Sequence, residues 1–144
     1  MPDGSIEIQG GEELEARLKT LTDRVAINVM AGAMYAGAKV IRTAARKLVP
    51  IMDLSKWGGP HEPGNLLANI FAGRTRSRDR NTVGALVGIS AAAFYGRFVE
   101  FGTKHARAFP FMRPAADESK EDAVAAVTEY AGRRIEIEAA KKVS

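Results

Sequence analysis

The two histidines are the first side chains to consider for chemistry, because imidazole is both a common metal ligand and a common general acid or base. His61 and His105 lie in predicted loops, beside proline or basic residues. Neither has a second histidine or a carboxylate at a ligand spacing such as HExxH. We therefore predict that both are surface residues and that the chain holds no metal site.

The sequence also lacks the motifs of common enzyme classes. It has no glycine-rich phosphate loop and no Gly-x-Ser-x-Gly nucleophile motif. It has no cysteine, which excludes thiolate catalysis, disulfides and cysteine-based metal sites. The carboxylates lie mostly at the starts of predicted helices, where the helix dipole and solvation explain them. The chain is predicted not to be an enzyme and to use no cofactor.

Four arginines alternate along one short segment: Arg74, Arg76, Arg78 and Arg80. Alternate side chains of an extended chain share one side, so these four could present a ladder of charge to DNA phosphates. No aromatic residue is interleaved, which argues against base stacking. The simpler interpretation is a solvated or inter-subunit hairpin tip. A small basic nucleic-acid-binding protein is the alternative function.

An arm over residues 103–114 holds two phenylalanines and two prolines with no regular period. Aromatic side chains on a proline-stiffened arm lose little entropy when they dock. The side chains of the arm could pack on the last helix of their own subunit or on a neighbouring subunit. We favour the first for Phe109 and the second for the basic residues of the arm. The expected contacts with a neighbouring subunit are Glu100, Lys104, Arg107, Phe109, Phe111 and Arg113.

Length and composition are those of an ordinary folded protein. The chain has 144 residues, 46% hydrophobic and 26% charged, which predicts one domain over residues 1–144. The net charge of +4 does not by itself require a nucleic-acid partner. No apolar run reaches about 18 residues and the start lacks the pattern of a signal peptide, so we predict no membrane segment.

Hydrophobic spacing predicts a long helix over residues 12–49, with Pro50 ending it. Its first apolar stripe is formed by Leu14, Leu18, Leu21 and Val25. Residues 30–38, at its centre, are rich in glycine and alanine. Each glycine costs about 1 kcal/mol in a helix interior. The segment could be a site of close helix packing or a tolerated weak spot, and both interpretations stay open.

The remaining elements are shorter. Alternation predicts a strand at residues 6–8 and two hairpin strands over 66–75 and 82–90. Between the first helix and the hairpin, residues 50–65 read as a proline-rich loop, whose Trp57 more often packs back on the core than anchors a partner. A last helix is predicted over residues 116–141. Its apolar stripe is Val124, Val127, Ala131 and Ile135.

A short helix is predicted before the arm, because Phe94, Phe98 and Phe101 fall at i, i+4 and i+7. We expect this face to pack into the core and Gly102 to end the helix. Glu100 is the acidic residue inside this segment. We expect it to pair with Arg97, with Arg113 or with a neighbouring subunit.

Several motifs stand out along the chain: Pro63-Gly64-Asn65-Leu66, Val87-Gly88, the segment Tyr95-Gly96-Arg97-Phe98-Val99-Glu100-Phe101-Gly102-Thr103, and Pro110-Phe111-Met112-Arg113-Pro114-Ala115. Together they resemble one family of phage proteins, the small morphogenesis proteins typified by the gene-ten product of HK-ninety-seven-type phages. Their order and spacing agree over nearly the whole chain. Pro63 and Met112 depart from the usual threonine and leucine.

This resemblance implies a structural virion protein of a tailed bacteriophage. The expected fold is α+β, with a long N-terminal helix and a C-terminal helix packed on a small, mainly antiparallel sheet. The expected function is a homo-oligomeric, hexameric ring that completes the tail at the head–tail junction. Its partners would be other copies, head-completion, tail-terminator or tail-tube proteins, and genome DNA in the channel. The protein would be made in the host cytoplasm and end in the virion.

Overall fold

The computed structural model describes residues 11–19, 21–51, 63–77, 79 and 82–143. Its elements are α1 (Gly11–Leu18), α2 (Asp23–Leu48), α3 (Asn65–Ala68), β1 (Ile70–Arg76), β2 (Val83–Ile89), α4 (Gly96–Phe101) and α5 (Met112–Val143), with a 3-10 turn over Ala91–Ala93. Helices flank a small antiparallel sheet, which confirms the α+β class. The strand at 6–8, Trp57 and most of the 50–65 loop lie outside the described residues. The single domain stays a prediction.

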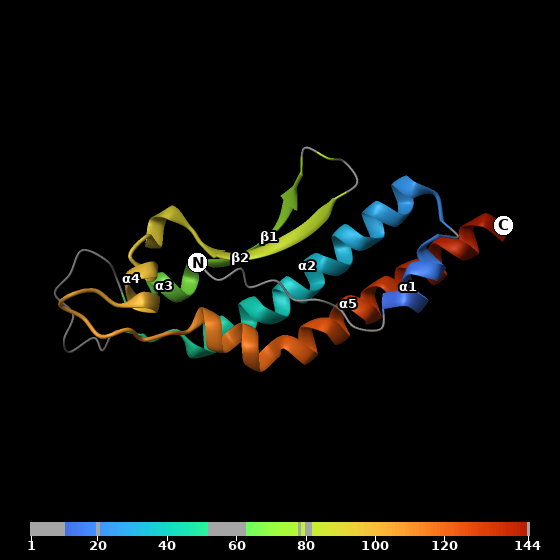
Figure 1. The fold of residues 1–144 in the computed structure, drawn as a ribbon. Helices are drawn as coiled ribbons and strands as arrows, with labels where there is room; N and C mark the ends of the chain where they lie inside the picture. The colour runs from blue at the N-terminus through green and yellow to red at the C-terminus, as the bar shows by residue number, and fades with distance from the viewer. Residues whose placement is uncertain (1–10, 20, 52–62, 78, 80–81, 144) are drawn as a thin grey trace.

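Helix α2 is the central element. The β1–β2 hairpin lies on one side of it and α5 on the other (Figure 1). At one end of the molecule, α3, α4 and the start of α5 surround a core cluster that includes Leu66, Ile70 and Phe111. At the other end, α1 packs near the end of α5, over a second cluster that includes Val29 and Ile135.

The single long helix predicted over residues 12–49 is wrong, because α1 and α2 are separate helices. Thr22 has an extended backbone (φ −64°, ψ 149°) and Asp23 begins α2, residue types that favour a helix start. The predicted stripe still lies together, since the turn keeps it on the core side. Its four members pack in one cluster: Leu14, Leu18, Leu21 and Val25. Helix α2 ends at Leu48, before Pro50, as predicted.

The small residues in the middle of α2 form a close packing site against α5, which decides between the two interpretations. A Cβ added to Gly37 would lie 2.7 Å from Val127 Cγ2 and 3.2 Å from the carbonyl oxygen of Ala123. A Cβ added to Gly32 would lie 2.6 Å from the nearest ring carbon of Tyr130. The glycines therefore let the two helices approach closely, and this packing offsets their poor helix propensity.

The β1–β2 hairpin is antiparallel, with Ile70 opposite Ile89. Strand β2 alternates as predicted, because Val87 and Ile89 pack on the core cluster while Leu86 is exposed. The guanidinium group of Arg46 ties the sheet to α2. It donates to the carbonyl oxygen of Ile70 from Nε (3.2 Å) and from a terminal nitrogen (2.8 Å).

Two predicted boundaries are wrong. The strand expected over residues 66–75 begins only at Ile70, because residues 65–68 form the helical turn α3. The last helix begins at Met112 rather than near residue 116, so its acidic cluster lies beyond the first turn. The irregular arm is correspondingly shorter than residues 103–114. The expected stripe on α5 is confirmed for Val127, Ala131 and Ile135, which are buried.

Candidate assembly surface

Glu100 lies on the inner side of α4 and is only 7% exposed. Its carboxylate accepts three backbone hydrogen bonds from the start of α5. The N–H groups of Phe111 (2.7 Å) and Met112 (2.9 Å) donate to Oε2, and that of Arg113 (3.1 Å) donates to Oε1. The next residue, Pro114, has no N–H to satisfy. Glu100 therefore caps the first turn of α5, where a negative charge also complements the helix dipole.

The predicted ion pairs of Glu100 with Arg97 and Arg113 are wrong. Within the described part of the chain no ion pair includes Glu100, and it bonds Arg113 only through the main chain. The Arg97 guanidinium instead lies 5.1 Å from the centroid of the Phe98 ring. The buried position of Glu100 leaves it little surface to offer a neighbouring subunit.

The capping contact gives a physical reason for the pair of motifs around Phe98–Thr103 and Pro110–Ala115. The first supplies the carboxylate, and the second supplies the helix start that receives it. The Pro-Gly-Asn-Leu motif joins the same end of the molecule, because the side-chain amide of Asn65 donates to the hydroxyl of Tyr95 (2.9 Å). Three motifs that are separate in sequence thus build one structural unit.

Gly102 ends α4 and turns the chain back, as its predicted helix-ending role requires. Its φ is +75°, and an added Cβ would lie 2.8 Å from the backbone nitrogen of Ala108, so both conformation and space require glycine. Thr103 then closes a tight turn by donating from its N–H to the carbonyl oxygen of Ala106 (2.9 Å). The N–H of Phe109 donates to the carbonyl oxygen of Val99 (2.7 Å), which holds the arm against α4.

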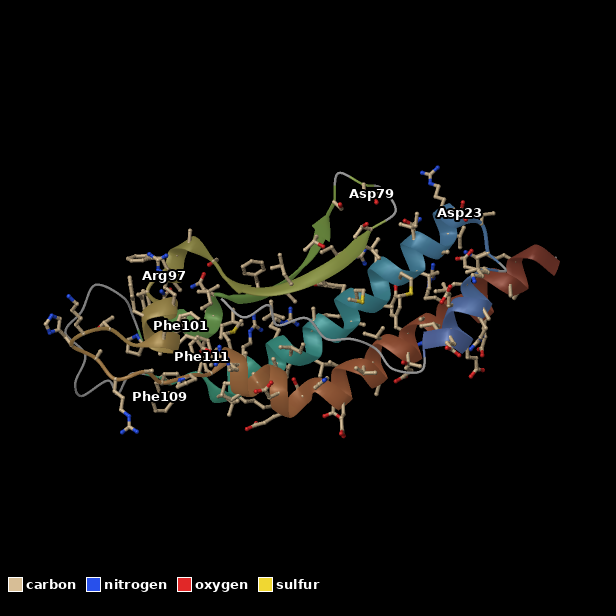
Figure 2. The ribbon with its side chains drawn as sticks, viewed as in Figure 1. Asp23, Asp79, Arg97, Phe101, Phe109 and Phe111 are labelled. Atoms are coloured by element: carbon tan, nitrogen blue, oxygen red, sulfur yellow. The ribbon has the colours of Figure 1, made fainter. Side chains whose placement is uncertain are left out.

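The phenylalanines in and just before α4 lie on the opposite side from the one expected. Phe94, Phe98 and Phe101 are 58%, 42% and 55% exposed, so the prediction that they pack into the core is wrong. Tyr95 and Val99 occupy the core side instead. Phe109 is 58% exposed at the same end of the molecule, so its expected packing on the last helix is also wrong (Figure 2). We call these four residues the aromatic surface: Phe94, Phe98, Phe101 and Phe109.

The other residues expected at a subunit contact divide into two groups. Lys104, Arg107 and Arg113 are exposed, so a partner can reach them. An open pocket on the arm is lined by Arg107, Ala108, Phe109 and Pro110. Phe111 is fully buried and supports the arm from within. Contact of any of these residues with a neighbouring subunit stays a prediction.

The first half of the arginine run lies in a strand and not in a hairpin tip. Arg74 and Arg76 belong to strand β1. The Arg74 guanidinium lies 5.4 Å from the centroid of the Tyr35 ring on α2, and Lys39 Nζ lies 5.1 Å from the same centroid. Arg78, Arg80 and the side chain of Arg76 fall outside the described residues. Contact of the run with DNA stays a prediction.

The described residues also show no arrangement for metal chemistry. No group of three or more histidine and acidic side chains that could hold a metal ion occurs among them. His105 is exposed on the arm, and His61 lies outside the described ranges. No helix in the described part of the chain is long and apolar enough to cross a membrane.

Comparison with known protein families identifies a match. No curated protein and no solved structure is significantly similar to the chain. A family model described as "Bacteriophage HK97-gp10, putative tail-component" matches residues 12–102. This range runs from α1 to the end of α4 and covers more than half of the chain; the arm and α5 follow it. The chain therefore belongs to the HK97-gp10-like family of bacteriophage tail components.

Proposed function

We propose that this tail component is a non-catalytic structural subunit that forms a closed homo-oligomeric ring at the head–tail junction of the virion and completes the tail there. The observation that carries the proposal is the aromatic surface. Large exposed phenylalanines gathered at one end of a small protein are typical of a surface that another protein covers. Membership of a tail-component family makes a virion protein the natural partner.

A second exposed apolar region supports contact between copies of the chain. Phe71 and Leu86, on adjacent strands of the hairpin, are 40% and 42% exposed. They belong to β1 and β2, whereas the aromatic surface is formed by residues around α4 and on the arm. Two different apolar regions on one chain fit a heterologous contact, in which one region of a subunit covers the other region of the next. Repetition of such a contact closes a ring when the rotation between subunits allows it, and six copies are our expectation.

The ring would hold its neighbours by surface complementarity rather than by chemistry. Its expected neighbours are head-completion, tail-terminator or tail-tube proteins, with genome DNA passing through the channel. The exposed basic residues of the arm, Lys104 and Arg107, lie near the aromatic surface and would contribute to the polar rim of a contact.

The proposal is tested by the mass and shape of the purified full chain. Multi-angle light scattering should give a discrete oligomer, and negative-stain electron microscopy should show closed rings. The double variant Phe98→Ser, Phe101→Ser should shift the protein to monomer, because loss of an aromatic anchor at an interface costs about 2 kcal/mol or more. That loss corresponds to a rise of about thirtyfold or more in the dissociation constant for each anchor.

Ile137→Ser is the matched control, because Ile137 is also an exposed apolar residue (42%) but lies far along α5. It should leave the oligomer unchanged. A wild-type chain that stays monomeric at all concentrations, or that is absent from purified virions, would contradict the proposed ring. If the double phenylalanine variant still forms the oligomer, the aromatic surface does not hold the subunits together.

A further inference from the structure

The first half of α5 carries an acidic cluster that its corrected boundary leaves unexplained. The cluster is Asp117, Glu118, Glu121 and Asp122, all exposed. The helix dipole acts most strongly within the first turn of a helix. Because α5 begins at Met112, these residues lie beyond that turn. They form two like-charged pairs at i, i+4, an arrangement that destabilises an isolated helix. Among the described residues none of the four takes part in an ion pair. We call them the acidic face.

A cluster of cations lies where α2 meets β1. It consists of Lys39, Arg42, Arg46 and Arg74, and we call it the basic seam. Lys39 and Arg74 share the ring of Tyr35, and Arg46 is bound to the carbonyl oxygen of Ile70. Arg42 Nε is buried and has no hydrogen-bond partner. No described ion pair includes any of the four cations, so their charge is not neutralised within this part of the subunit.

The two clusters lie on opposite layers of the molecule. The hairpin, and with it the basic seam, is on one side of α2, and α5 is on the other (Figure 1). The side of α5 that faces α2 holds Ala115, Ser119 and Ala123, which are buried, so the exposed acidic face points away from α2. The subunit therefore cannot bring its own two clusters together.

We infer that the basic seam of one copy binds the acidic face of the next copy in the ring. The inference rests on the proposed ring and names a specific contact in it. Each cluster supplies four charges, and one contact between copies would neutralise both. The acidic face is also close to the aromatic surface, since Glu100 of α4 caps the start of α5, while Arg74 belongs to the same hairpin as Phe71 and Leu86. The charged and apolar pairs can thus belong to one heterologous interface.

Duplex DNA is the other polyanion that a basic seam could bind. DNA would satisfy the cations but would leave the acidic face of α5 without a partner. A second copy of the chain accounts for both clusters, so we favour it.

Charge reversal with rescue tests this contact in the full chain. The seam variant is Lys39→Glu, Arg74→Glu, and the face variant is Glu118→Lys, Glu121→Lys; all four residues are exposed, which limits harm to folding. Two reversals bring the net charge of the mutated cluster from four to zero and remove its attraction to the intact cluster, so each variant should raise the dissociation constant of the oligomer about tenfold or more. The quadruple variant again sets the reversed residues of one cluster against opposite charges of the other and should reassemble. The control Arg24→Glu, Lys47→Glu makes the same charge change at the two ends of α2 and should keep the wild-type assembly.

Light scattering at increasing salt and a DNA-binding titration read out the outcomes, with circular dichroism to verify folding. Loss of the oligomer in both reversal variants together with rescue supports the contact, as does weakening of wild-type assembly by salt. If both reversal variants assemble like the wild type, or if the quadruple variant fails to reassemble, the contact is overturned while the proposed ring stands. A seam variant that loses DNA binding while its oligomer persists overturns it in favour of nucleic acid. A wild-type monomer would instead refute the ring itself.

Discussion

The α2–α5 packing site and the α4–arm end bury their residues in opposite ways. Between α2 and α5, the closest approach is made by glycine and alanine, with Gly37 against Ala123 and Val127. At the α4–arm end, large phenylalanines stay exposed while a carboxylate, Glu100, is buried. Side-chain size and polarity alone would predict the reverse.

The contrast arises because backbone groups that need hydrogen-bond partners determine which side chains are buried. The start of α5 exposes N–H groups that require an acceptor, so burial of Glu100 beneath them is favourable. In the middle of α2 the backbone N–H groups already have partners within the helix. Close contact with α5 therefore stabilises this part of α2. The exposed phenylalanines contribute neither a backbone cap nor close helix packing, so their side chains stay accessible to a partner.

The strongest test of this contrast compares the two phenylalanines of the arm. Phe111 is fully buried and Phe109 is 58% exposed, although they are separated by a single proline. Phe111→Ala should lower the free energy of unfolding by about 3–5 kcal/mol, because it leaves a cavity in the core. Phe109→Ala should lower it by less than about 0.5 kcal/mol, as a surface change does. Urea denaturation of both variants at a concentration where the chain is monomeric measures the difference, and equal losses would contradict the burial of Phe111.

The cap on α5 gives the next largest effect. Glu100→Ala removes the acceptor for the N–H groups of Phe111, Met112 and Arg113 and should destabilise the fold by about 2–3 kcal/mol. Glu118→Ala is the matched control, since Glu118 is an exposed glutamate on α5 and should change stability by less than about 0.5 kcal/mol. Hydrogen exchange at the first turn of α5 should accelerate in the first variant alone. Unchanged exchange there would mean that the cap is dispensable.

Local sequence signals predicted the positions of helices and strands better than the contacts between them. Pro50 ends α2 and alternation locates β2, because each signal acts on the backbone within a few residues. The break before Asp23 escaped prediction because the apolar stripe continues through it in space. The Thr22-Asp23 pair was the available signal for that break.

The candidate site depended on contacts that no local pattern carries. Around α4 the sequence offers two apolar sets, Phe94–Phe98–Phe101 and Tyr95–Val99, and only the tertiary fold selects which one is buried. Likewise, the acceptor role of Glu100 follows from a helix start that lies after the arm, so the spacing within its own helix could not reveal it. The motif pair was visible in the sequence, but its physical meaning required the structure.

The smallest expected effect concerns two helical glycines. A change to alanine should shift the free energy of unfolding in opposite directions at the two sites. Gly37→Ala places a methyl group against Val127 and the Ala123 carbonyl, and overpacking should lower the free energy of unfolding by about 1–2 kcal/mol after the gain in helix propensity. Gly132 on α5 has only the end of the Arg17 side chain near an added Cβ, at 3.9 Å. Gly132→Ala should therefore stabilise the protein by about 0.5–1 kcal/mol. Urea midpoints that rise in both variants would show that helix propensity, and not close packing, governs the centre of α2.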